Sequence, residues 1–361
     1  METTLTADRT FFENSHGRLF PMSRILVIVG PTAVGKTEIG LRLAEWLDGE
    51  IVSADALQAY RGLDIGTAKP SPDERAKIRH HLIDILDPAE DFSAGEFARR
   101  ARGVIGEVEG RHRLPIVVGG SGFYLRALLE GLNEVPTVRP AVRKDLRRRL
   151  EQEGLDALRE ELLVLDPSTA GRLAPGDTQR LLRALEVAIS TGRALSAWHC
   201  DAPATGPRLD AIRVGLTLER GLLYDSIAHR VHRMIEAGWV GEVEQLLSRG
   251  VSPREPAFQA IGYRELAAHL AGDVSLEEAI EETIRATRRF AKRQLTWFRK
   301  ERDINWYSAE DLEAASQAIM SFLTRKGLGV GDGQADNQHP GRVPVSGPEG
   351  EQAGVGSTDD R

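Results

Sequence analysis

The sequence predicts an α/β fold with a parallel sheet at its centre, on three observations. Segments 25–29, 50–53 and 115–118 are short, apolar and rich in β-branched residues, as expected of strands buried on both faces. Glycine-rich turns follow the first and the third of these segments, and each turn leads into a helical pattern. The first turn fits the phosphate-binding pattern G-x-x-x-x-G-K-[ST]. Strands that alternate with helices predict a doubly wound sheet whose chemistry lies at the carboxyl ends of the strands.

The first glycine turn is the strongest candidate binding site. It consists of Gly30, Pro31, Thr32, Ala33, Val34, Gly35, Lys36 and Thr37. Backbone N–H groups and a helix N-terminus can bind an anion there, while Lys36 adds a positive charge and Thr37 can bind Mg²⁺. The turn therefore predicts a diphosphate or triphosphate with Mg²⁺, but it does not by itself predict a nucleotide.

The chain divides into four parts by composition and periodicity. Residues 1–22 predict a flexible leader, and 23–138 together with 206–326 predict the catalytic core, with a strand at 211–218 and then helices up to 326. Residues 139–205 predict a helical insertion with helices at 140–152, 155–165 and 178–190. Residues 327–361 carry six carboxylates, two arginines and few large apolar residues, which predicts a disordered acidic tail.

Composition limits the classes of protein. The single cysteine, Cys200, excludes an intramolecular disulfide framework and a C-x-x-C metal site. No apolar run approaches the ~20 residues that cross a bilayer, and the N-terminus lacks the apolar core of a secretory signal, so we expect a cytoplasmic protein. The formal net charge of −7 says little about a nucleic-acid partner, because much of the acid lies in the tail.

Asp55 follows the second predicted strand, at the same sheet edge as the glycine turn. A carboxylate there can act as a general base or bind Mg²⁺ through water, and the structural alternative is a helix N-cap. Gln58 and Tyr60 follow closely. The third strand leads into Gly119-Gly120-Ser121 instead of the acidic residue that holds Mg²⁺ in many NTPases, which weakens an ATPase interpretation.

Two further segments predict contact with RNA. Gln179, Arg180 and Arg183 share one face of an insertion helix, which is either a phosphate-contacting face or a solvated one. The predicted helix 275–302 is acidic in its first half and carries eight cations in its second, with Trp297 and Phe298 interleaved, as suits an RNA backbone. Segment 259–264 predicts a tight turn with an exposed aromatic and an exposed arginine.

Several motifs together resemble the tRNA dimethylallyltransferases over residues 24–307. They are GPTAVGKT, SADALQAY, RGLDIGTAKP, HHLIDI, IVVGGSGFYLRALLEGL, DTQRLLRALEV, AIGYRE and AKRQLTWFRK. The resemblance implies a P-loop-kinase-like core with an all-helical insertion that contacts tRNA. It also implies transfer of a dimethylallyl group from dimethylallyl diphosphate to N6 of adenosine 37, beside the tRNA anticodon, by a cytoplasmic, monomeric, Mg²⁺-dependent enzyme.

The resemblance also assigns roles to residues. It implies catalytic roles for Asp55 as the base, Lys36, Ser121 and Arg220, with Arg220 contacting the diphosphate. The positions that it implies for tRNA contact are Asp55, Ala56, Leu57, Gln58, Ser121, Arg143, Gln179, Arg180, Leu181, Leu182, Arg183, Gln259, Gly262, Tyr263, Arg264, Lys292, Arg293, Gln294, Trp297 and Arg299. Ala56 and Ser121 depart from the serine and threonine usual in the family, and Ala56 removes a hydroxyl.

Three alternatives to tRNA prenylation stay open. A small-molecule or nucleoside kinase would use the glycine turn for ATP and Asp55 as a base toward a hydroxyl. A non-catalytic RNA-binding protein would use the basic helices alone. An adenylate isopentenyltransferase would prenylate AMP or ATP, although the helical insertion and the basic helix favour a macromolecular acceptor.

Overall fold

The computed structural model describes residues 11–13, 19–21, 24–132, 135, 138–201 and 208–328. Most of the predicted flexible leader and nearly all of the predicted acidic tail lie outside these residues. Within the leader, strands β1 (Phe11–Glu13) and β2 (Leu19–Pro21) pair antiparallel. None of the described helices is long and apolar enough to cross a membrane.

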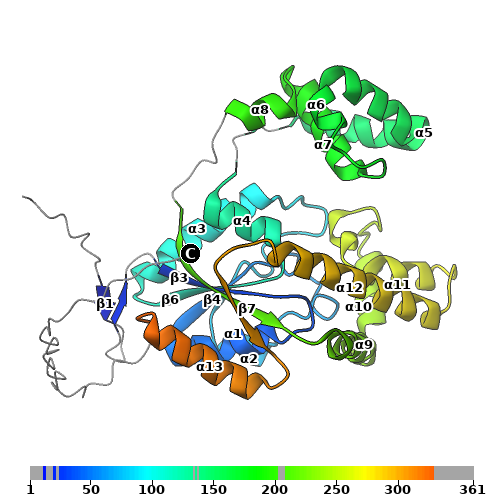
Figure 1. The fold of residues 1–361 in the computed structure, drawn as a ribbon. Helices are drawn as coiled ribbons and strands as arrows, with labels where there is room; N and C mark the ends of the chain where they lie inside the picture. Colours follow the sequence, from blue (N-terminus) through cyan, green and yellow to red (C-terminus); the bar gives the residue numbers. More distant parts are fainter. Residues whose placement is uncertain are drawn as a thin grey trace, which may run out of the picture. The chain divides into compact units, whose positions relative to one another are not determined.

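A six-stranded sheet forms the centre of the described core, and all of its described strand pairs are parallel (Figure 1). The strand order is β5-β4-β6-β3-β7-β8. The strands are β3 (Arg24–Val29), β4 (Gly49–Ser53), β5 (His80–His81), β6 (Leu114–Val118), β7 (Asp210–Thr217) and β8 (Ile304–Ser308). The predicted fold class, a parallel sheet with surrounding helices, is confirmed.

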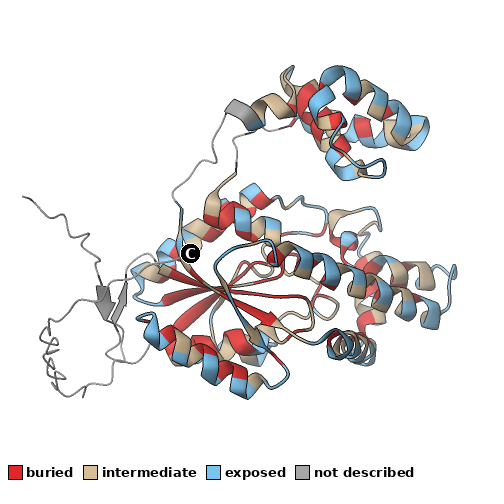
Figure 2. Ribbon diagram, viewed as in Figure 1, coloured by how far each residue is buried: buried red, intermediate tan, exposed pale blue. Residues whose placement is uncertain are grey.

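Side chains alternate between the two faces of β3, as the two-residue period of a strand requires. Leu26 and Ile28 pack with helices α1 (Lys36–Leu47) and α13 (Leu312–Arg325). Ile25 and Val27 pack on the other face with helices α3 (Ala94–Gly110) and α4 (Gly122–Glu130). Because both faces are covered, the central strands are buried along their length, as Figure 2 shows in red.

The four strands predicted from apolar runs are confirmed, but two further strands of this sheet were missed, as was the β1–β2 pair within the predicted leader. β5 has only two residues, and β8 lies within a segment that was predicted to be wholly helical. β8 is an edge strand with the sequence INWYS and no fully buried residue, so its sequence lacks the continuous apolar run of a central strand. Its pairing with β7 supplies the backbone hydrogen bonds that the sequence pattern does not reveal.

A second helical cluster follows β7. It comprises α9 (Arg220–Glu236), α10 (Trp239–Ser248), the 3₁₀ helix η1 (Pro256–Gln259), α11 (Tyr263–Leu270) and α12 (Leu276–Phe298). Its core contains Trp239, Phe258 and Tyr263, whose rings make edge-to-face contacts at centroid distances of 5.6 and 6.2 Å. Helix α12 begins at a Ser275–Glu278 capping box and ends four residues earlier than predicted.

The described part of the predicted insertion consists of helices and no strand. These are α5 (Pro140–Leu165), α6 (Pro167–Ala170), α7 (Thr178–Thr191) and α8 (Leu195–Asp201). Helix α5 is broken at Gly154, whose φ of 82° fits the predicted gap between two helices. Leu158, Leu162 and Leu185 are among the residues of a separate apolar core. Buried Asp166 connects α6 to α8, because its carboxylate accepts hydrogen bonds from Thr169 and Ser196. Burial opposes ionisation of this carboxyl, but the hydrogen bonds outweigh burial and lower its pKa to about 2.

Candidate active site

The phosphate-binding turn joins β3 to α1, and its backbone conformation requires glycine. Gly30 and Gly35 have φ angles of 151° and 94°, in the region that side chains disfavour. A Cβ atom on Gly30 would also lie 2.6 Å from the carbonyl oxygen of Leu216 on the neighbouring strand. Helix α1 begins directly at Lys36, so its free N–H groups face the turn. The local sequence therefore builds a turn with the backbone geometry that anion binding at a helix N-terminus requires.

One pocket gathers segments that are far apart in the sequence. Its lining includes Thr32, Lys36, Thr37, Ile51, Ser53, Asp55, Gln58, Thr67, Ala68, Pro70, His80, Val118, Gly119, Gly120, Arg230, Phe290 and Gln294. The glycine turn, the residue after β4 and the turn after β6 thus meet at the carboxyl edge of the sheet, as the parallel topology predicts. This convergence is the strongest structural indication of an active site.

Three charged side chains dominate this pocket: Lys36, Asp55 and Arg230. Burial of the ammonium, together with the positive charge of Arg230, lowers the pKa of Lys36 to about 7, while the charge of Asp55 opposes the shift. Burial also lowers the pKa of Arg230, against the opposing effect of Asp55. Two desolvated cations that repel each other favour an anion placed between them. The Nζ atom of Lys36 donates a hydrogen bond to the carbonyl oxygen of Pro31 at 2.6 Å.

Binding of diphosphate is expected to take up a proton at about pH 8. Because the pKa of Lys36 is about 7, this amine is mostly neutral at that pH. A bound anion stabilises the ammonium and raises its pKa, so binding draws a proton from solution and weakens as the pH rises above 7. Calorimetric titration with inorganic diphosphate and Mg²⁺ in two buffers of different ionisation enthalpy measures this uptake. Lys36→Met should abolish it, and an uptake that persists in this variant contradicts the assignment.

Asp55 lies in a turn, so the alternative of a helix N-cap is wrong. Its Oδ1 atom accepts a hydrogen bond from the backbone N–H of Leu57 at 2.9 Å, which is the geometry of an Asx turn. Gln58, close behind it, accepts a hydrogen bond from the Ser53 hydroxyl at 2.9 Å. The carboxylate is thus held at the pocket by short local contacts.

Gln294 of α12 also lines the pocket, although it lies more than 170 residues after the glycine turns in the sequence. Its Oε1 atom accepts from the backbone N–H of Thr32 at 2.8 Å, and its Nε2 atom donates to the carbonyl oxygen of Gly120 at 3.0 Å. A Cβ atom on Gly120 would lie 2.1 Å from that Nε2 atom, so glycine is needed for the bridge. Gln294, which was predicted to contact tRNA, is buried, lines the pocket and joins the two glycine turns through these two hydrogen bonds.

The arginine in the pocket is Arg230, and the predicted Arg220 does not line it. Arg220 is exposed at the start of α9, with its guanidinium over the ring of Tyr224. Arg230 falls on the buried side of the same helix, beside Ile227 and Val231. Helical spacing from these apolar residues was the signal available in the sequence, because an arginine among buried positions indicates an interior role. Ser121 precedes α4 and is also not among the residues that line the pocket.

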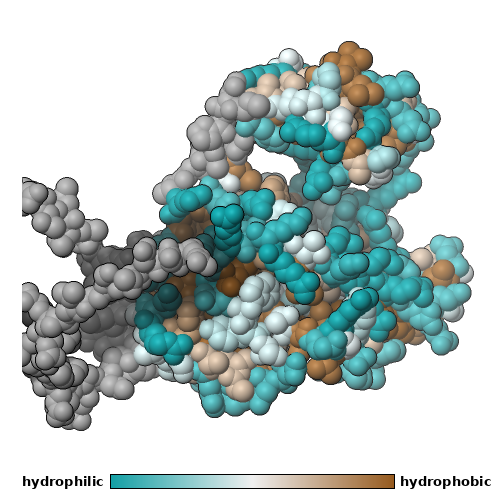
Figure 3. All heavy atoms as spheres, viewed as in Figure 1, coloured by the Kyte–Doolittle hydropathy of each residue, from teal (hydrophilic) through white to brown (hydrophobic). Residues whose placement is uncertain are grey.

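The predicted RNA-contacting residues divide by exposure. Gln179, Arg180, Gln259, Arg264, Lys292, Arg293 and Arg299 are exposed, whereas Ala56, Leu57, Gln58, Ser121, Arg143, Leu182, Arg183 and Trp297 are half-buried. Leu181, Gly262, Tyr263 and Gln294 are buried. The surface over α12, at the front of the view, is mostly hydrophilic (Figure 3).

Four aromatic or charged residues of the predicted RNA-contacting segments make contacts within the protein. The expected exposed aromatic of segment 259–264 is wrong, because Tyr263 is fully buried and its hydroxyl donates to Glu242 at 2.6 Å. Phe298 is also buried, so it is not a free stacking surface. Trp297 packs against Gly122, with the guanidinium of Arg126 over its ring. Arg143 forms ion pairs with Glu186 and Asp91.

Comparisons with known proteins place this geometry in a family. The model of the family described as IPP transferase matches residues 58–301. A tRNA dimethylallyltransferase 2 of Geotalea uraniireducens is 46% identical over 283 residues, which cover 78% of this chain and 91% of that protein. A tRNA dimethylallyltransferase of Geobacter sulfurreducens is 46% identical over 303 residues, covering 83% and 97%.

Solved structures agree with this placement. The full-length tRNA isopentenylpyrophosphate transferase from Bacillus halodurans is 39% identical and has a TM-score of 0.62, with 84% of this chain and 97% of that chain covered. A eukaryotic dimethylallyltransferase acting on tRNA is 27% identical with a TM-score of 0.70, over 86% and 81%. The chain therefore belongs to the IPP transferase family.

Proposed function

We propose that this protein transfers a dimethylallyl group from dimethylallyl diphosphate to N6 of adenosine 37 in a tRNA anticodon stem-loop and releases diphosphate. The observation that carries the proposal is the single pocket in which a phosphate-binding turn, two cations and one carboxylate converge. Relatives named for this reaction support it. We further propose that the enzyme acts as a monomer in the cytoplasm.

The diphosphate end of the donor fits the glycine turn. Negative charge grows on this leaving group as the allylic C–O bond breaks, and groups fixed around it stabilise that charge. Backbone N–H groups of residues 33–37, the Lys36 ammonium and the Arg230 guanidinium would supply this stabilisation. Arg230 takes the role that the sequence assigned to Arg220.

Mg²⁺ fits the oxygen donors on one side of the pocket. Thr37 lines it and offers a hydroxyl oxygen, and Mg²⁺ commonly takes one or two protein oxygens and completes its shell with phosphate oxygens and water. No cluster of three or more His, Cys, Asp or Glu residues that could hold a metal occurs among the described residues, which agrees with a metal held mainly by the substrate. Bound there, Mg²⁺ would neutralise part of the diphosphate charge.

Asp55 is positioned to accept a proton from the attacking amine. The lone pair of the adenine N6 amine is delocalised into the ring, so loss of a proton to a nearby carboxylate assists the attack. The adenosine has to leave the stack of the anticodon loop to reach a recessed site of this kind. One loop carries both the proposed base and Gln58, and both side chains line the pocket.

Exposed cations offer a surface for the tRNA backbone. We propose that Lys292, Arg293 and Arg299 of the basic helix contact phosphates, together with exposed Gln179 and Arg180 of the helical insertion. Their neighbours Arg285 and Arg289 are less available, because both pair with Glu282 and Arg285 also pairs with Glu281.

Neutralising Lys292, Arg293 and Arg299 with glutamine is expected to weaken tRNA binding and flatten its salt dependence. Each lost phosphate contact should reduce the slope of log K against log salt by about 0.7–0.9. Tight binding of dimethylallyl diphosphate should persist, because that ligand lies at the glycine turn. Filter binding at several salt concentrations measures the slope. The matched control, Arg285→Gln with Arg289→Gln on the same helix, should change it much less, and equal changes in both variants would contradict the assignment.

The reaction itself is tested with radiolabelled dimethylallyl diphosphate and an anticodon stem-loop that carries adenosine at position 37. Nucleoside analysis should recover the label as N6-(dimethylallyl)adenosine, and a stem-loop with guanosine at that position should stay unlabelled. AMP and ATP offered in place of RNA test for an adenylate isopentenyltransferase. Phosphoryl transfer from ATP to a small acceptor would instead support a kinase, and RNA binding without turnover under any donor would support a binding protein.

A further inference from the structure

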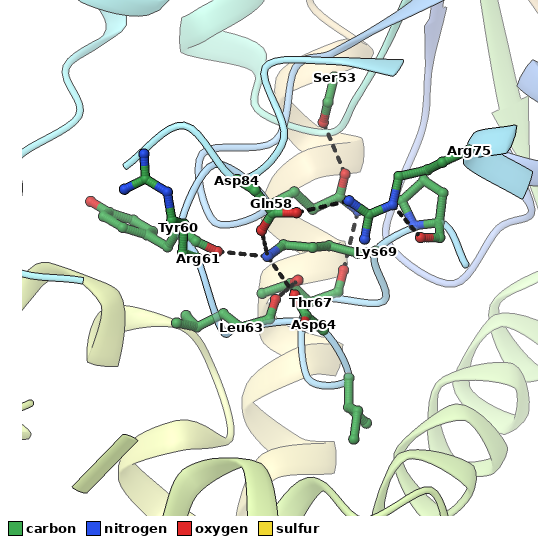
Figure 4. A network of polar contacts seen from close by, with 12 residues as sticks. Ser53, Gln58, Tyr60, Arg61, Leu63, Asp64, Thr67, Lys69, Arg75 and Asp84 are labelled. Atoms are coloured by element: carbon green, nitrogen blue, oxygen red, sulfur yellow. Dashed lines mark hydrogen bonds and ion pairs between the residues drawn. The ribbon is translucent and has the colours of Figure 1, made fainter. Parts of the chain in front are cut away.

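The wall loop, residues 55–70, forms one side of the pocket and encloses a buried lysine. Lys69 has a side-chain exposure of 1%. Its Nζ atom donates to the carbonyl oxygen of Tyr60 at 2.6 Å, to Asp64 Oδ1 at 2.7 Å and to Asp84 Oδ1 at 2.5 Å (Figure 4). All three protons of the ammonium are thereby used, so Lys69 has no donor left for a substrate. Its contacts close the loop on itself and fix it to the segment that follows β5.

The residues on either side of Lys69 face the pocket. Ala68 and Pro70 both line it, and so does Thr67. Gln58 Nε2 donates to the carbonyl oxygens of Thr67 and Ala68 at 3.2 Å each, while its Oε1 atom is held by Ser53 (Figure 4). The side chain of Gln58 is therefore locked between β4 and the end of the loop that Lys69 secures.

Ala68 adopts a backbone conformation that needs support. Its φ of 48° lies in the left-handed region, which a residue other than glycine occupies at a cost. Such strain persists where surrounding contacts fix the backbone, and it concentrates at functional sites. Here the supporting contacts are the hydrogen bond from Gln58 to the Ala68 carbonyl and the anchored side chain of Lys69.

The outer side of the wall loop is anchored separately. Glu242 of α10 accepts hydrogen bonds from the backbone N–H groups of Asp64, Ile65 and Gly66, at 2.7, 2.7 and 3.2 Å. The Trp239 ring fills the space beside Gly66, where a Cβ atom would lie 2.1 Å from its Nε1 atom. Because these contacts use backbone N–H groups and the Trp239 ring and not the Lys69 ammonium, loss of the lysine should displace the inner side of the loop and leave the loop attached.

We infer that Lys69 is a positioning residue for prenyl transfer, which it supports by holding Gln58 and the strained Ala68 in place without touching either substrate. The inference rests on the proposed function. Asp84 accepts hydrogen bonds from both Lys69 and Arg75. Burial opposes ionisation of its carboxyl, but these hydrogen bonds outweigh burial and lower its pKa. The Asp84 carboxyl therefore stays ionised at neutral pH, with both of its oxygens engaged.

The test replaces Lys69 with methionine, which has a similar length and no charge. In a single-turnover assay at saturating tRNA and donor, Lys69→Met should slow transfer by about 10- to 100-fold, the cost of a misplacement of about 1 Å at a reacting centre. The dissociation constant of dimethylallyl diphosphate should stay within about twofold, because the glycine turn does not depend on the wall loop. Lys77→Met, at an exposed position on α2 (Pro72–Lys77), is the matched control and should react as wild type.

A double-mutant cycle with Gln58→Met separates positioning from general destabilisation. If Lys69 acts through Gln58, the double variant should be no more than about threefold slower than Gln58→Met alone. Three results would overturn the inference. The first is that the rate losses of the two single variants multiply in the double variant, and the second is that Lys69→Met reacts at the wild-type rate. The third is that Lys69→Met has a lowered melting temperature and regains its rate when the assay is run well below that temperature. Absence of transfer by the wild-type enzyme would instead overturn the proposed function.

Discussion

Asp55→Asn is expected to slow the chemical step by about 10²–10⁴-fold, the usual range for loss of a positioned base. Asparagine keeps the oxygen that accepts from the Leu57 N–H, so the Asx turn and the loop should keep their shape. It removes the negative charge that accepts the N6 proton. Binding of tRNA and of the donor should therefore change little while the single-turnover rate constant falls.

Rapid-quench measurement of a single turnover, with both substrates saturating, isolates this step from binding and product release. In the wild type, burial and Arg230 lower the pKa of Lys36, and the negative charge of Asp55 offsets part of that shift. Asp55→Asn removes the offset, so the pKa of Lys36 should fall further. An Asp55→Asn enzyme that loses tRNA affinity but keeps its single-turnover rate would show that Asp55 binds RNA and is not the base.

Arg230→Met is expected to have the second-largest effect, with a rate loss of about 10²–10³-fold, as for other groups that stabilise developing charge. Arg230 lines the pocket beside Lys36 and Asp55, so its loss removes positive charge where the diphosphate leaves. It should also relieve the repulsion that lowers the pKa of Lys36, so this pKa should rise above about 7.

Arg220→Met is the matched control on the same helix. Arg220 lies ten residues before Arg230, is exposed and contacts the ring of Tyr224. Because Arg220 does not line the pocket, its loss should change the rate little. Steady-state and single-turnover assays of both variants, with melting temperatures to confirm folding, decide between the two arginines. A large loss in Arg220→Met together with a small loss in Arg230→Met would restore the assignment made from the sequence.

The helical cluster shows how a motif can be recognised and yet misinterpreted. The AIGYRE segment was expected to expose an aromatic ring to RNA. In the structure, Tyr263 lies in the cluster's core and holds Glu242, which in turn holds the backbone of the wall loop. The motif thus supports the wall loop of the pocket through Glu242 and does not itself line the pocket. Nothing in six consecutive residues indicates that their partner is a loop about 200 positions earlier in the chain.

The same applies to the basic helix. Its charge pattern is visible in the sequence, and Lys292 and Arg293 are exposed as a charged face requires. That Gln294, the next residue, is buried depends on the close approach of Gly120 and Thr32, which lie 174 and 262 positions away. Only packing of α12 against the sheet edge creates that contact.

The sequence by itself determined the features that neighbouring residues control. The glycine turn, the four strands with apolar runs, the break at Gly154 and the place of Asp55 after β4 all follow from local backbone preference and apolar period, which act within about ten residues. The tertiary structure alone decided that Tyr263 is buried, that Gln294 joins the two glycine turns, and that segment 304–308 becomes an edge strand. Those outcomes depend on contacts between segments far apart in the chain, where the free energy of packing and of hydrogen bonding to a distant partner outweighs the preference of the local sequence.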